Sequence, residues 1–135
     1  MKKHLLVLAI ASSCFVGTYA SAMTKDEYNV AKQKVEADYK ANKDKCGTLS
    51  ANAKDICQAE AKGTEKVAKA ELEQQYKPTA AHARKVAEEK VDAAYEVAKE
   101  KCDDQSGDAK NACVKQAKAD EAQGKAEVKA MKKAM

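Results

Sequence analysis

The sequence is poor in the residues that build large hydrophobic cores. It contains no tryptophan, one phenylalanine and one proline, and after residue 22 only eleven leucine, isoleucine and valine residues. Much of its apolar content is alanine, whose burial removes little area from water, so this composition cannot support a thick globular core. After residue 22 the 23 basic and 21 acidic residues nearly cancel. Low net charge and abundant helix formers favour slender, stable helices over a disordered chain.

The residue types and motifs that usually form catalytic sites are also scarce. His82 is the one histidine after residue 22, and a single histidine cannot build a histidine-based catalytic or metal site alone. We expect it to face solvent in the first turn of a helix. The sequence has no glycine-rich phosphate loop and no nucleophile and base with useful spacing. We therefore expect no catalytic residue, no cofactor and no enzyme activity, and weak net charge with few aromatics argues against nucleic-acid binding.

Residues 1–22 have the layout of a cleavable secretory signal peptide. Two lysines precede the apolar run 5–10, and small residues occupy 20–22 at the usual cleavage positions. The apolar run is shorter than the ~20 residues that span a bilayer, so we expect a mature chain that starts at Met23 and has no transmembrane segment. The alternative is a lipoprotein acylated at Cys14. We favour free secretion because the site at 20–22 is better formed.

Residues 27–75 and 83–131 are two copies of one unit, offset by 56 positions. Nineteen of the 49 aligned positions are identical. The recurring residues include Val30, Val35, Tyr39, Cys46 and Cys57, which return as Val86, Val91, Tyr95, Cys102 and Cys113. Chance matches in an Ala/Lys-rich chain would not also align two cysteine pairs and a tyrosine. The repeat predicts two supersecondary units, residues 23–77 and 78–135.

Each unit is expected to be a helical hairpin. The strong helix formers Ala, Lys, Glu and Gln dominate, and Pro78 breaks the helix between the units. Turn-like segments at 47–50 and 103–107 interrupt each unit. The candidate N-caps are Ser50 or Asn52, Ser106 or Asp108, and Thr79. The predicted fold is all-α, with helices near 24–46, 52–76, 79–102 and 108–133, arranged either as a bundle or as an elongated rod.

Apolar stripes mark the faces that should pack. The stripe residues are Tyr28, Ala31, Val35, Tyr39, Asn42 and Cys46 in the first helix, and Ala87, Val91, Ala94, Ala98 and Cys102 in the third. These three- and four-residue steps place each stripe on one helix face, towards a partner helix. Tyr39 and Tyr95 could instead line a ligand groove, but core packing is the favoured interpretation.

Four cysteines remain after the signal peptide. In an exported protein an even number indicates disulfides, and four cysteines permit three pairings. We favour Cys46–Cys57 and Cys102–Cys113, because one ancestral hairpin had to be self-sufficient. Each bridge should stabilise its hairpin by about 3 kcal/mol. In the alternative, all four thiols share one end of a bundle and bind Zn(II) or Cu(I), although ten intervening residues exceed the usual zinc spacing.

The C-terminal segment offers one further candidate surface. Its basic residues are Lys125, Lys129, Lys132 and Lys133, and its apolar residues are Val128, Met131 and Met135. Such a segment could touch an anionic membrane surface. Its apolar face is thin, so we favour a chain that makes no membrane contact.

The stretch C…LSANAKDIC.AEAKGTEKVAKAELE..YKP and its copy resemble small, exported, Ala/Lys-rich proteins of Gram-negative bacteria that are labelled TolA-like or envelope-biogenesis proteins. The resemblance covers nearly the whole mature chain and carries over no catalytic residue. The export signal, the missing catalytic groups and this resemblance together lead us to expect a non-catalytic, soluble periplasmic protein with a structural, stress-related or interaction role. An unidentified envelope protein is the candidate partner. The alternative is a periplasmic protein that binds Cu or Zn through Cys46, Cys57, Cys102 and Cys113.

Overall fold

The computed structural model describes residues 23–133, and this part of the chain folds into four helices. They are α1 (Lys25–Cys46), α2 (Ala51–Tyr76), α3 (Ala80–Cys102) and α4 (Gly107–Lys133). Every predicted helix boundary lies within one residue of the observed one. The all-α prediction and the two tandem hairpins are confirmed. The predicted signal peptide and Cys14 lie outside the described residues.

The expected N-cap residues Thr79 and Ser50 differ in whether their side chains cap the following helix. Thr79 caps α3, since its hydroxyl accepts a hydrogen bond from the backbone N–H of His82 at 3.1 Å. Ser50 occupies the N-cap position of α2 but makes no side-chain capping bond. The neighbouring Asn52 is used between hairpins instead, because its side-chain amide donates to the carbonyl oxygen of Glu100 at 2.7 Å.

A disulfide closes the turn of each hairpin. Cys46 bonds to Cys57 and Cys102 to Cys113, with Cα–Cα distances of 5.5 and 5.6 Å. These separations are normal for disulfides. Cys46 and Cys102 are completely buried. The structure therefore confirms pairing within each repeat, and each bridge lies at the junction of two helices.

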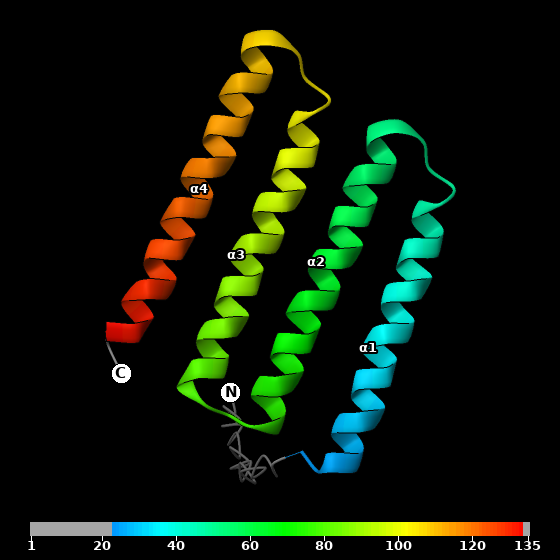
Figure 1. Cartoon of the computed structure of the whole chain (residues 1–135), viewed down its shortest axis with the longest axis vertical. Coiled ribbons are helices and arrows are strands. Elements are labelled where there is room, and N and C mark those ends of the chain that lie inside the picture. The colour runs from blue at the N-terminus through cyan, green and yellow to red at the C-terminus, as the bar shows by residue number, and fades with distance from the viewer. Residues whose placement is uncertain (1–22, 134–135) are drawn as a thin grey trace, which may run out of the picture.

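The four helices lie side by side in a single row (Figure 1). Only neighbours along the chain touch: α1 packs on α2, α2 on α3 and α3 on α4, with no other helix contact among residues 23–133. Along the helix axes, both disulfide turns lie at the same end of the molecule, and the link 77–79 between the hairpins lies at the opposite end. The result is a one-layer array with α1 and α4 as its two edges.

The core of this array is as thin as the composition predicts. Its buried apolar residues are Cys46, Ala61, Ala70, Leu72, Cys102 and Ala117. Three of these six belong to α2, which has a neighbour on both sides. The predicted stripes are buried or half-buried, with the exception of Ala94, which is exposed. No buried side-chain nitrogen or oxygen within the described range lacks a hydrogen-bond partner.

Candidate functional site: the groove between α2 and α3

The contact between the hairpins depends on small residues. A Cβ atom added to Gly63 in α2 would lie only 2.8 Å from the Cβ of Ala93 in α3. That distance is too short for two carbon atoms, so glycine is required at this helix separation. A glycine inside a helix costs about 1 kcal/mol relative to alanine. The close packing of α2 on α3, the most extensive helix contact in the array, offsets this cost.

On one face, α2 and α3 enclose an open, largely apolar groove of about 600 Å³. Its floor is formed by Gly63, Thr64, Val67, Ala68, Ala93, Ala94, Val97 and Ala98. Its rim carries two ion pairs that join the helices, Lys90–Glu71 at 2.7 Å and Lys101–Glu60 at 3.4 Å. An apolar floor between charged rims suits the apolar face of an amphipathic helix. This is hereafter the α2–α3 groove.

The opposite face of the same contact is polar. A smaller hollow of about 340 Å³ lies there. The charged and amide side chains that line it are Asp55, Gln58, Lys62, Lys66, Asp92, Glu96 and Glu100. The two faces of the array therefore differ at its centre, and only one of them combines an apolar floor with a charged rim.

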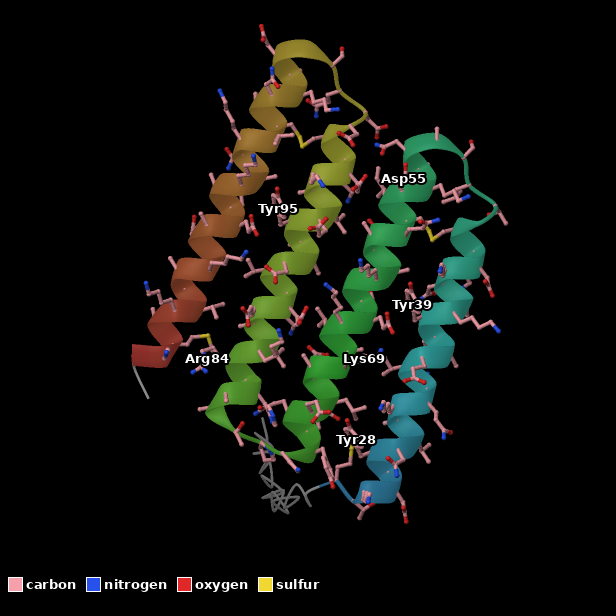
Figure 2. All side chains as sticks on the ribbon, in the orientation of Figure 1. Tyr28, Tyr39, Asp55, Lys69, Arg84 and Tyr95 are labelled. Atoms are coloured by element: carbon pink, nitrogen blue, oxygen red, sulfur yellow. A yellow bond between two sulfur atoms is a disulfide. The ribbon has the colours of Figure 1, made fainter. Side chains whose placement is uncertain are left out.

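The structure does not bring Tyr39 and Tyr95 together. Figure 2 places Tyr39 between α1 and α2 and Tyr95 between α3 and α4. Both are half-buried in their own hairpins. Tyr95 lines a hollow of about 390 Å³ with Val91 and Ala117, while the ring of Tyr39 lies 6.0 Å from the ammonium group of Lys43. No shared aromatic pocket results.

His82 lies in the first turn of α3, as expected, but its residue is half-buried. The ring folds back on the link between the hairpins, where Nδ1 is 2.6 Å from the carbonyl oxygen of Lys77. Because a carbonyl oxygen only accepts, this contact requires a proton on Nδ1. The sequence-based expectation of a solvent-facing ring missed this local contact, which depends on the backbone path through Pro78.

The four cysteines lie towards one end of the molecule, as the metal hypothesis required. All four are engaged in disulfides. Across the described range, His, Cys, Asp and Glu side chains form no group of three or more that could hold a metal ion. A thiolate site would therefore first require reduction of both bridges, because disulfide sulfurs are not thiolates.

The C-terminal helix uses part of its basic character internally. Lys125 pairs with Glu121 at 2.6 Å and with Asp92 at 3.3 Å, and hydrogen bonds to these two carboxylates raise the pKa of Lys125. Val128 is half-buried, and Met131 is 39% exposed. In residues 23–133 no helix has the length and apolar character needed to cross a membrane.

No protein-family model, curated protein or solved structure matches this chain.

Proposed function

We propose that this protein is a non-catalytic component of the periplasm that binds other envelope components through the α2–α3 groove. The observation that carries the proposal is the one-layer array. Helices usually bury their apolar stripes against a second layer. Here an apolar floor that includes Val67 and Val97 lies open on one face. Such a surface suits an interaction role better than chemistry on a small substrate.

The occupant that fits best is an amphipathic helix of an envelope protein. The floor consists mainly of alanine and valine, which admit a helix at close range. Each end of the groove carries one acidic and one basic side chain, Glu60 with Lys101 and Glu71 with Lys90. A partner helix with an apolar stripe flanked by charges of both signs would complement this surface.

The periplasmic location rests on two independent features. Two disulfides close the hairpins, and disulfides persist in oxidising compartments. Residues 1–22 also read as a secretory signal. Osmotic-shock fractionation with non-reducing peptide mapping tests the location. We expect release with the periplasmic fraction and both local disulfides, and a cytoplasmic protein with free thiols would contradict it.

Site-specific photo-crosslinking in cells tests the groove. A photoreactive amino acid at Ala94, exposed on the groove floor, should give discrete adducts with envelope proteins. Val97→Glu in the same chain should abolish them, because it places a charge on the apolar floor. The matched control is the same amino acid at Lys62, exposed on the polar face. Equal adducts from both positions, or none from position 94, would count against the proposal.

The second candidate is thiol-based binding of Cu(I) or Zn(II). The observation in its favour is that the turns after α1 and α3, where the two cysteine pairs lie, are at the same end of the helices (Figure 1). Titration of the reduced protein with each metal separates the two functions. Tight binding of one metal per four thiols, with release of protons from the thiols, would favour the metal-binding function. Binding to each pair separately, or no tight binding, would favour the interaction role.

A further inference from the structure

The two edges of the array keep some of the residues that join its centre. Because the hairpins are related by a shift of 56 residues, α1 corresponds to α3 and α4 corresponds to α2. The side of α3 that packs on α2 therefore corresponds to the outer side of α1. Likewise, the side of α2 that packs on α3 corresponds to the outer side of α4. Neither outer side has a helix neighbour among the described residues.

The outer side of α1 keeps much of the α3 half of the central contact. Val30, Lys34, Ala37 and Lys45 stand where α3 has Val86, Lys90, Ala93 and Lys101, with identical residue types. Val86 is half-buried, whereas its counterpart Val30 is 67% exposed. No other large hydrophobic side chain of the described residues is so exposed. Val30 is thus an apolar side chain on the outer side of α1 that no neighbouring helix of the described residues covers.

The outer side of α4 carries a row of small residues at helical spacing. These exposed alanines are Ala119, Ala122, Ala126 and Ala130. Ala126 corresponds to Ala70, which is only 7% exposed in the contact region of α2. Glu127 corresponds to Glu71, which pairs with Lys90 across the central contact. The α4 edge therefore keeps Ala70 and Glu71 of the α2 half, although Gln123 replaces Val67.

We propose that the protein self-associates head to tail, with the outer side of α4 in one copy packed on the outer side of α1 in the next. This contact reproduces the α2 and α3 packing between molecules. Glu127 then faces Lys34 of the next copy, as Glu71 faces Lys90 at 2.7 Å within the chain. Lys34 now pairs with Asp38 at 2.8 Å, an exposed pair that is readily exchanged. Two different surfaces meet, so the row can continue.

The contact between copies should be weaker than the α2–α3 contact within one chain. Ala119 stands in place of Gly63, so α4 cannot approach α1 of the next copy as closely as α2 approaches α3. Lys115 replaces Ala59, which adds a charge to the contact. The central contact also benefits from a short covalent link, equivalent to a local concentration on the order of millimolar. Association should therefore be reversible and concentration-dependent.

Sedimentation velocity of the oxidised mature protein, at concentrations up to about 1 mM, tests the proposal. The average mass of the sedimenting species of the wild type should rise with protein concentration. Ala119→Gly should lower the protein concentration needed for self-association by about tenfold, because it lets α4 approach α1 of the next copy as closely as α2 approaches α3. Ala119→Arg should leave the protein monomeric. Ala94→Arg, the same change on an exposed alanine of the groove face, is the matched control and should associate like the wild type. Circular dichroism verifies that each variant is folded.

Charge reversal provides a second, independent test. Lys34→Glu and Glu127→Lys should each weaken association several-fold, because like charges then meet at the contact. An equal mixture of the two variants should regain wild-type association, since every reversed charge meets an opposite one. The proposal is overturned if the wild type and Ala119→Gly stay monomeric throughout. It is also overturned if Ala94→Arg abolishes association and Ala119→Arg does not, because the copies would then stack through their faces.

Discussion

The two hairpins share a closed end but differ at their open ends. In the first hairpin the rings of Tyr28 and Tyr76 stack with centroids 4.6 Å apart, and the hydroxyl of Tyr28 donates to the carboxylate of Glu73. The second hairpin has cations at all three corresponding positions, Arg84, Lys132 and Lys129. Figure 2 shows Tyr28 and Arg84 at matching places in the two hairpins.

Both copies of the duplicated unit keep the disulfide, whereas the tyrosine stack belongs to the first copy. The first hairpin is held at one end by its disulfide and at the other by the contact of Tyr28 with Tyr76 and Glu73, hereafter the aromatic clamp. Within residues 23–133 the second hairpin has a disulfide but no stacked aromatic pair. The ion pair between Lys125 and Asp92 joins α3 and α4 near the middle of the second hairpin and not at its open end. We infer that opening of the molecule begins where α4 ends.

At the disulfide end the second hairpin has the more favourable turn residue. Ala51 and Gly107 occupy corresponding positions, and both have positive φ angles, of 49° and 56°. An L-residue in the left-handed region is destabilised by roughly 1–2 kcal/mol, whereas glycine adopts it freely. The first hairpin therefore combines the better clamp with the more strained turn.

The largest expected effect comes from removing the disulfides. Cys46→Ala with Cys57→Ala, and Cys102→Ala with Cys113→Ala, should each reduce the free energy of unfolding by about 3 kcal/mol. Loss of the second bridge should also unfold its own hairpin further, because no clamp remains there. Circular dichroism melts, with hydrogen exchange of α3 and α4 against α1 and α2, measure both effects. An unchanged melting temperature after reduction would contradict the stapling role.

The sequence was sufficient to predict the hairpins because their determinants are local. Helix propensity, Pro78 and the capping residue Thr79 act within a few positions, and the repeat constrains the cysteine pairing. The boundaries of all four helices followed from these features.

The row and its groove depend on contacts between distant positions, which single-chain patterns do not encode. The role of Gly63 appears only when Ala93, thirty positions away, is placed against it. Alanine-rich faces are also too uniform to specify whether α1 returns to cover α3 or stays at the edge. The one sequence signal that could have indicated the contact was the glycine at 63, within an otherwise strong helix-forming segment.

Gly63→Ala tests the joint between the hairpins. The added methyl group would force α2 and α3 apart, at a cost of about 1–3 kcal/mol, partly offset by about 1 kcal/mol of helix propensity. We expect a net loss of up to about 2 kcal/mol in the free energy of urea unfolding. The transition should also broaden as the hairpins uncouple. Gly124→Ala is the control within the second hairpin, where the new methyl meets the side chain of Val91, and the hairpins should stay coupled.

Transferring the aromatic clamp into the second hairpin tests whether the clamp accounts for the difference between the two open ends. The triple change Arg84→Tyr, Lys129→Glu and Lys132→Tyr should stabilise that hairpin by about 1–2 kcal/mol, because it replaces three cations with a stacked pair and a hydrogen bond. Hydrogen exchange should slow at the end of α4. If exchange there does not change, the open end is held by other contacts, and the proposed difference between the hairpins is wrong.

The turn residues can be exchanged between the hairpins. Ala51→Gly should stabilise the protein, and Gly107→Ala should destabilise it, each by about 1 kcal/mol. The opposite signs are the informative feature, because they distinguish backbone strain from a general effect of glycine on helix starts. Thermal melts of both variants at neutral pH measure the pair. Two changes of the same sign would exclude the strain argument.

The smallest effect concerns the protonation of Tyr28. Its hydrogen bond to Glu73 raises the pKa of Tyr28 above the ordinary value of 10.0, because the bond requires the neutral hydroxyl. The bond therefore contributes fully below pH 10.0 and is lost as the pH rises through the raised pKa. Tyr28→Phe should lower stability by about 1 kcal/mol or less at neutral pH. The difference between wild type and variant should shrink towards zero in urea titrations at higher pH, since both then lack the bond. Tyr95→Phe, in the second hairpin, is the matched control, and a difference that stays constant with pH would contradict this role for Tyr28.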